Sequence, residues 1–208
     1  MLNSVILFFY YNLIIFSIIG YGFLANKILF KSENLALIGF IGLSFLAFLS
    51  LTTSLIFKHN FINNIIILIL GLINLFYFSY KSKEKKKYLL LLFGLSLIFF
   101  LIIITPGTHS DFDYYHLPFI RYLTEHKIIF GLGHANHSYN FISSLFYLNS
   151  LFVLPYIEYF AINIISISFL IFFNFYLLLN IFEKKKLNYY IKFFSLLDLF
   201  FFNYIFNS

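Results

Sequence analysis

Long apolar runs separated by short polar segments dominate the hydropathy pattern of this chain. A helix that crosses a membrane needs roughly 20 predominantly apolar residues, and several runs reach or approach that length. The pattern predicts spanning helices at 3–24, 35–57, 61–80, 88–105 and 157–182, with a sixth run at 187–208. It therefore predicts an all-α, multipass integral membrane protein with about five to six transmembrane helices.

Lysine clusters at 81–87 and 184–186 indicate which segments face the cytoplasm, because positively charged short loops stay on that side of the membrane. Counting crossings from the first cluster places the N-terminus outside, and residues 106–140 outside as well. Lys58 and His59 fall on the same outer side. We therefore expect a multipass protein of the cell inner membrane, with its lysine-rich loops in the cytoplasm.

Three segments follow from this topology. Residues 1–105 form a bundle of spans, residues 106–156 form a large external loop, and residues 157–208 hold further spans. The loop is expected to carry two helices that lie at the membrane interface, Leu117 to Lys127 and Phe141 to Pro155. In the first of these, Pro118 suits an initial helical position and Arg121 stands four residues before Glu125, where the two can pair. Gly131 and Gly133 would end it.

The composition supports the membrane class and excludes others. Hydrophobic residues make up 62% of the 208 residues, and the chain contains no cysteine, so disulfides, thiolate nucleophiles and thiolate-bound zinc are excluded. The mean hydropathy is +0.91. The net charge of +6 resides in short loops and forms no basic face, so we expect the lipid bilayer as a partner and no nucleic acid.

Ionisable residues gather in one polar stretch between otherwise apolar segments. Five of the six histidines and three of the eight acidic residues lie between His109 and His137. A charge near the centre of a bilayer costs on the order of 3 kcal/mol, so this stretch is expected to be a loop and to hold the functional site.

The motifs of this stretch resemble a family of uncharacterised bacterial multipass proteins that is often grouped with the GT-C superfamily of glycosyltransferases. The family carries an Asp five residues before the His of a Tyr-His-Leu, which here reads from Asp111 to Leu117. Gly131-Leu132-Gly133 and, in part, Phe141-Ile142-Ser143-Ser144 match later motifs. The chain departs from the family at His134-Ala135-Asn136 and Ser138, where the family has Asn-Leu-His followed two residues later by Arg. The resemblance covers about 40 residues.

The resemblance implies that a sugar is transferred from a polyprenyl-phosphate carrier to an acceptor, with inversion at the anomeric carbon. It implies Asp111 as the general base and Asp113 as second choice, since a partly desolvated carboxylate can accept a proton from the attacking hydroxyl. Arg121 could bind the departing phosphate, and His116 could donate or carry a proton.

Structural alternatives remain for these residues. Asp113 or Ser110 could cap the helix near Leu117, Arg121 could only pair with Glu125 or attract lipid phosphates, and His116 could only bond to the loop backbone.

Metal binding is a second hypothesis for the same stretch. A divalent cation such as Mg²⁺, Mn²⁺ or Zn²⁺ could hold a carrier phosphate or serve a lipid-phosphate hydrolase. The candidate ligands are His109, Asp111, Asp113, His116, His134 and His137.

A third hypothesis is a non-enzymatic role in transport or assembly. Charges within spans would favour it, and Glu158 and Asp198 are such residues. Because the apolar run at 187–208 stops without a polar tail, the chain is expected to be an N-terminal fragment. Its missing C-terminal half, or a partner chain, would then complete the protein.

Overall fold

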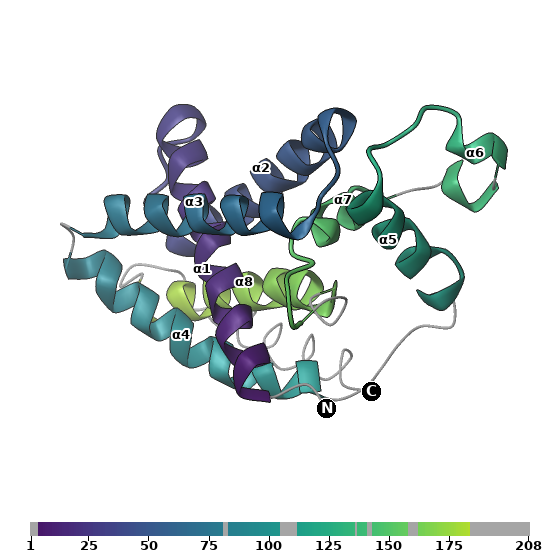
Figure 1. Ribbon diagram of the computed structural model, residues 1–208. Coiled ribbons are helices and arrows are strands. Elements are labelled where there is room, and N and C mark those ends of the chain that lie inside the picture. The colour runs from purple at the N-terminus through teal and green to yellow at the C-terminus, as the bar shows by residue number, and fades with distance from the viewer. Residues whose placement is uncertain are drawn as a thin grey trace.

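The structure is a computed structural model that describes residues 4–80, 83–104, 112–135, 137–140, 143–157 and 162–183. The described residues form helices and contain no strand (Figure 1). The helices are α1 (Ser4–Leu29), α2 (Leu35–Ile56), α3 (Phe61–Ser79), α4 (Lys83–Ile104), α5 (Leu117–Glu125), α6 (Leu132–Ala135), α7 (Ser144–Ser150) and α8 (Ile162–Glu183). A π-helical turn, Phe112–His116, precedes α5, and a 3-10 turn, His137–Asn140, follows α6.

Among the described residues, four helices are long and apolar enough to cross a membrane: α1, α2, α3 and α8 as far as Ile181. These four helices coincide with predicted runs, and the chain is accordingly a membrane protein. The run predicted at 88–105 is helical as α4, and its crossing of the membrane stays a prediction. The sixth run, 187–208, lies outside the described residues, as do Glu158 and Asp198.

Asparagine side chains define where two of these helices begin. The Asn34 carboxamide oxygen accepts hydrogen bonds from the amides of Ala36 and Leu37 at the start of α2. The Asn60 carboxamide oxygen accepts one from the amide of Asn63 at the start of α3. Amide groups in the first turn of a helix have no partner within the helix, so these caps stabilise the two starts by about 1 kcal/mol each.

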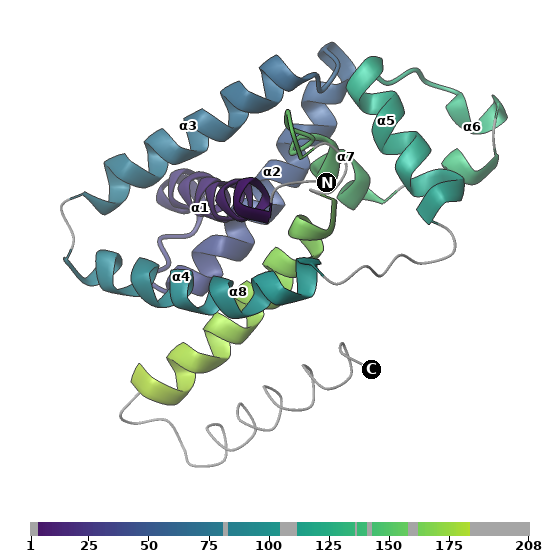
Figure 2. The ribbon, with the colours of Figure 1, turned by 60° about the horizontal axis from the view of Figure 1, so that its bottom comes forward.

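The first helix, α1, runs through the middle of the bundle and packs against α2 and α3 (Figure 2). Glycines permit this close packing. A Cβ atom on Gly20 would overlap the backbone carbonyl of Gly71 on α3, and one on Gly42 of α2 would overlap the carbonyl of Ile18. Small residues at such crossings let helix backbones approach closely, which is how helices associate where no water drives them together.

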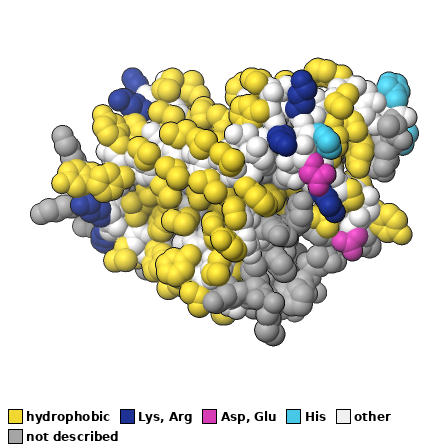
Figure 3. Space-filling model, viewed as in Figure 1, with side chains coloured by type: hydrophobic (Ala, Val, Ile, Leu, Met, Phe, Trp, Pro, Cys, Tyr) yellow, Lys and Arg dark blue, Asp and Glu magenta, His cyan; other side chains and the backbone are white. Residues whose placement is uncertain are grey.

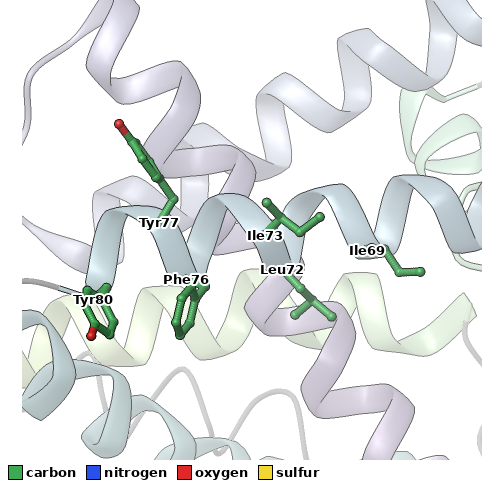
Figure 4. A pocket seen from close by; sticks show the side chains of 6 residues that line it. All are labelled: Ile69, Leu72, Ile73, Phe76, Tyr77 and Tyr80. Atoms are coloured by element: carbon green, nitrogen blue, oxygen red, sulfur yellow. The ribbon is translucent and has the colours of Figure 1, made fainter.

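The face of the bundle seen in Figure 3 is largely apolar. On α3, Ile69, Ile73 and Phe76 are exposed and form an apolar strip, and Tyr77 and Tyr80 lie at its C-terminal end (Figure 4). Exposed aliphatic side chains that end in tyrosines are typical of a helix facing lipid, because tyrosine is enriched at the membrane–water boundary. This face therefore supports contact with a bilayer.

The two helices predicted in the external loop are present, with different surroundings. Helix α5 starts at Leu117 with Pro118 in its first turn, and it buries Phe119 and Leu123 while Arg121 is exposed, as expected for an amphipathic helix.

Helix α7 is shorter than the predicted helix from Phe141 to Pro155, and its residues from Phe146 onward are all buried. Its polar residues Asn149 and Ser150 are buried together with the apolar ones. Helix α7 is therefore covered by other parts of the protein, and the expectation that it lies at the membrane interface stays a prediction.

Candidate functional site

The loop helices α5 and α7 share a small apolar core of their own. Phe119 lies at the centre of this core, with its ring centroid 5.5 Å from that of Tyr147 on α7 and 5.5 Å from that of Tyr139. Ile120 and Leu123 of α5 complete it against α7. The described part of the polar stretch therefore belongs to a packed helical unit, which we call the loop unit (residues 112–135, 137–140 and 143–157).

Asp113 lies in the π-helical turn that leads into α5. Because this turn is helical, the helical backbone begins before Leu117, the start that the sequence predicted. His116 is the residue at the N-cap position of α5, and no side chain forms a capping hydrogen bond there. The alternative that Asp113 caps α5 is therefore wrong, and its side chain is exposed. Single π-helical turns occur frequently at functional sites.

His116 occupies an aromatic slot between the start of α5 and the side of α7. Its ring centroid lies 4.3 Å from that of Tyr115 and 4.6 Å from that of Phe146. The residue is half-buried, and its imidazole packs against these two aromatic rings. Such packing fixes the direction of the ring, which a proton donor or carrier requires.

Arg121 pairs with Glu125, as the sequence predicted for residues one helical turn apart. The Arg121 Nε atom donates to Glu125 Oε1 at 3.0 Å, with 66% and 52% of the two side chains exposed. An exposed pair of this kind contributes about 0.3–0.5 kcal/mol, so an anionic ligand could displace the carboxylate at low cost. Asp113 and Arg121 are eight residues apart on one helical segment, roughly 12 Å along its axis.

The end of α5 differs slightly from the prediction. The helix stops at Glu125, because the next residue, His126, has an extended backbone. Gly131 has a φ of 88° and begins the turn into α6, where the amide of His134 donates to its carbonyl at 2.9 Å. Only glycine adopts this left-handed conformation without strain. Gly131 therefore shapes the turn before α6 instead of ending α5.

The predicted metal ligands are not assembled within the part of the chain that the structure describes. No group of three histidine, cysteine, aspartate or glutamate side chains there could hold a metal ion. Of the six candidates, Asp113 and His116 lie on the π-helical turn before α5, whereas His134 lies on α6 and His137 on the 3-10 turn after it. His109 and Asp111 lie outside the described residues, as does Ser110, so the metal site and the role of Asp111 stay predictions.

A buried polar cluster that the sequence did not reveal attaches the loop unit to the bundle. We call it the polar junction; it comprises Thr53, His59, Asn64 and Ser150. His59 Nδ1 lies 2.6 Å from Ser150 Oγ on α7, and His59 Nε2 lies 3.0 Å from Thr53 Oγ1 on α2. Asn64 Nδ2 donates to the carbonyls of Ser150, at 2.8 Å, and Val153, at 2.8 Å. The junction therefore joins α2, α3 and α7 through side chains.

Backbone hydrogen bonds reinforce the same attachment. The amide of His59 donates to the carbonyl of Leu123 at 2.9 Å, and the amide of Ile128 donates to the carbonyl of Ser54 at 2.9 Å. The first bond ties α5 to the connection between α2 and α3, and the second ties the segment after α5 to α2 itself.

His59 is neutral at physiological pH. It is completely buried, and this burial lowers its pKa to about 4. A neutral imidazole donates from one ring nitrogen and accepts at the other. The Thr53 and Ser150 hydroxyls also lie 2.7 Å from the carbonyls of Leu49 and Tyr147, so the hydroxyl that donates to the ring gives up its bond to its carbonyl. Within the described residues, the carboxamide oxygens of Asn64 and Asn149 are buried without a hydrogen-bond partner, which costs about 1–3 kcal/mol for each. Any further buried polar group without a hydrogen-bond partner would therefore weaken the junction.

The polar junction and the lysine-rich connections lie at opposite ends of α3. The N-terminus of α3 adjoins His59, whereas near its C-terminus Phe78 contacts Lys27, with the ammonium nitrogen 5.7 Å from the ring centroid. Lys85 of α4 lies near the same end, over Phe23 at 4.8 Å. The 19 residues of α3 separate the two ends by about 27 Å, close to the roughly 30 Å of a hydrocarbon core. Figure 3 shows acidic and histidine side chains gathered at the loop-unit end.

Comparisons with known proteins place the chain in a family without adding an activity. No curated protein and no solved structure matches it. The family described as "Domain of unknown function (DUF8201)" matches residues 3–208, almost the full length, and the chain belongs to that family.

Proposed function

We propose that the chain acts as a GT-C-like membrane glycosyltransferase, which transfers a sugar from a polyprenyl-phosphate carrier to an acceptor at the outer face of the bacterial inner membrane. The observation that carries this proposal is the position of the loop unit. Its histidine- and acid-bearing helices are packed on one end of the bundle, about one bilayer thickness from the lysine-rich end. Polar catalytic groups would then sit beside lipid headgroups, where a carrier phosphate resides.

The proposed orientation follows from the lysines. With the lysine-rich connections in the cytoplasm, the polar junction and the loop unit face outside, and the N-terminus is outside as well. In this arrangement α4 and the run at 187–208 would raise the number of spans to five or six.

The proposed reaction uses Asp111, which precedes the loop unit in the sequence, and residues at the start of the loop unit. Asp111, or Asp113 as second choice, takes the proton from the acceptor hydroxyl. The acceptor oxygen then forms a bond to the anomeric carbon as the bond to the carrier phosphate oxygen breaks, so the configuration inverts. Arg121 binds the departing phosphate, and the roughly 12 Å between Asp113 and Arg121 leaves room for the sugar between them.

His116 and a divalent cation are secondary parts of this proposal. His116, held by Tyr115 and Phe146, would donate a hydrogen bond to the sugar or the phosphate. A Mg²⁺, Mn²⁺ or Zn²⁺ ion at the predicted ligands would neutralise the carrier phosphate.

The test is transfer of radiolabelled sugar from polyprenyl phosphate in membranes that contain the wild-type chain or Asp111→Asn. A general base contributes about 10²–10⁴-fold, so Asp111→Asn is expected to lose at least about 100-fold in transfer. Glu33→Gln is the matched control, because it makes the same carboxylate-to-amide change at an exposed site in the connection between α1 and α2. Equal transfer by Asp111→Asn and wild type would remove Asp111 from the mechanism.

A further inference from the structure

Helices α4 and α8 pack against each other (Figure 2). A groove of about 610 Å³ lies between them. Its volume falls within the range of about 300–1,000 Å³ that is usual for small-molecule sites. Its lining residues come from one face of α4 and one face of α8. They include Lys87, Leu91, Gly94 and Ile98 of α4, and Phe175 and Leu179 of α8.

The groove is open at its middle because of Gly94. A Cβ atom built on Gly94 would meet no other atom within 4 Å, in contrast to Gly20 and Gly42, where a Cβ would overlap a neighbouring helix. Gly94 therefore does not serve close packing of helices. Its missing side chain leaves space along an otherwise aliphatic wall.

The length of the groove fits a lipid tail in one leaflet. From Lys87 to Ile98 the groove follows α4 for about 16 Å. One leaflet contributes half of a hydrocarbon core of roughly 30 Å, or about 15 Å. A single acyl chain with its headgroup at Lys87 would therefore reach the midplane at Ile98.

Charge at the mouth of the groove favours an anionic headgroup. Lys85 and Lys86 lie over aromatic rings, with their ammonium nitrogens 4.8 Å from the Phe23 centroid and 5.5 Å from the Tyr80 centroid. Lys87 is exposed and is the charged residue in the groove lining. The described residues that line the pocket on the α3 strip in Figure 4 are aliphatic or aromatic, and Lys86 lies over the ring of Tyr80 at its end without being part of the lining.

We propose that the groove between α4 and α8 binds one acyl chain of an anionic phospholipid whose phosphate pairs with Lys87. Basic residues next to a membrane helix recognise anionic lipids in this way. The proposal requires that α4 lies in the membrane, as its apolar sequence from 88 to 105 predicts. It is independent of the proposed glycosyl transfer.

A fluorescence experiment tests the proposal because the chain contains no tryptophan. Ile98→Trp places a single reporter at the inner end of the groove. Ile69→Trp is the matched control on the exposed strip of α3, because Ile69 lies about 16 Å along its helix from Tyr80, as Ile98 does from Lys87. Each full-length variant is reconstituted in phosphatidylcholine vesicles that contain brominated phosphatidylglycerol or brominated phosphatidylcholine. We expect brominated phosphatidylglycerol to quench Ile98→Trp more strongly, and the two lipids to quench Ile69→Trp equally. Equal quenching of Ile98→Trp by both lipids would overturn the proposal.

Second substitutions in the Ile98→Trp chain identify the cause. Lys87→Gln is expected to reduce the preference for phosphatidylglycerol about fivefold, whereas Lys86→Gln, which removes the same charge beside Tyr80, leaves it unchanged. Gly94→Leu fills the groove and is expected to abolish the preference, while circular dichroism verifies that helix content is retained. Equal effects of Lys86→Gln and Lys87→Gln would mean a diffuse surface potential and would overturn the site.

Two other occupants give distinct results. If a second copy of the chain fills the groove, Ile98→Trp is shielded from both brominated lipids and Gly94→Leu converts a cross-linked dimer into monomer. If polyprenyl phosphate displaces phosphatidylglycerol at equal concentration, the groove serves the carrier. Either result overturns the assignment to a phospholipid.

Discussion

Protonation of His59 is expected to weaken the attachment of the loop unit to the bundle. His59 lies in the connection between α2 and α3, fully buried, and its pKa of about 4 compares with an ordinary value of 6.5. The difference of about 2.5 between these values, at 1.36 kcal/mol per pKa unit, corresponds to about 3 kcal/mol. This is comparable to the effect of breaking a buried hydrogen-bonded group, so it is large enough to open the polar junction.

The sign follows from which state binds the proton more tightly. The unfolded or undocked state takes up a proton near pH 6.5, whereas the docked state takes it up only near pH 4. His59 therefore does not change the free energy of docking of the loop unit above about pH 6.5. The docked state becomes less stable as the pH drops from 6.5 to 4, and below that range it has lost about 3 kcal/mol.

Hydrogen exchange of the loop unit in detergent micelles measures this effect. The amides of His59 and Ile128, which bond to Leu123 and Ser54, report docking directly. Their protection in wild type is expected to fall between pH 7 and pH 4 relative to the amides of α1, after correction for the intrinsic pH dependence of exchange.

Two variants isolate the contribution of His59. His59→Asn cannot take up the proton and is expected to show a much weaker pH dependence, although its docking is weaker at every pH. His126→Asn is the matched control, because His126 is exposed at the end of α5 and should leave the wild-type profile intact. If wild type and His59→Asn lose protection in parallel from pH 7 to pH 4, the reasoning about His59 is refuted.

Three further predictions concern packing, sidedness and surface charge. Gly71→Ala is expected to destabilise the bundle by about 1–3 kcal/mol, because the added Cβ would overlap Ser17. Gly94→Ala is expected to stabilise α4 by about 0.5–1 kcal/mol, because its Cβ meets open space and alanine favours the helix. Thermal unfolding in detergent measures both effects. In this cysteine-free chain, Lys58→Cys and Lys86→Cys are expected to react with an impermeant maleimide from opposite sides of the membrane; reaction from one side refutes the topology. Glu125→Gln, which removes the exposed ion pair of α5, is expected to change stability by no more than about 0.5 kcal/mol.

The sequence by itself determined the features that depend on neighbouring residues. The apolar runs predicted α1, α2, α3 and α8 because a stretch of about 20 apolar residues forms a helix in lipid whatever it packs against. Pro118 marked the first turn of α5, and the pairing of Arg121 with Glu125 followed from one turn of helix. These are local consequences of helix geometry, and a single chain reveals them.

Only the tertiary structure decided what the polar residues do. His59 and Ser150, which form a hydrogen bond, are 91 residues apart in the sequence, and Asn64 is 86 residues from the Ser150 carbonyl to which it donates. The residues next to His59 in the chain therefore do not predict the polar junction. The burial of α7 was also decided by the tertiary structure, because a segment with scattered serines and asparagines has the sequence pattern of a surface helix. The sequence does not distinguish the roles of Gly20 and Gly94. Gly20 is needed for the contact between α1 and α3, whereas Gly94 leaves open space in a groove. The physical reason is that hydrogen bonds and close packing in this protein join segments far apart in the chain, whereas hydropathy is summed over adjacent residues.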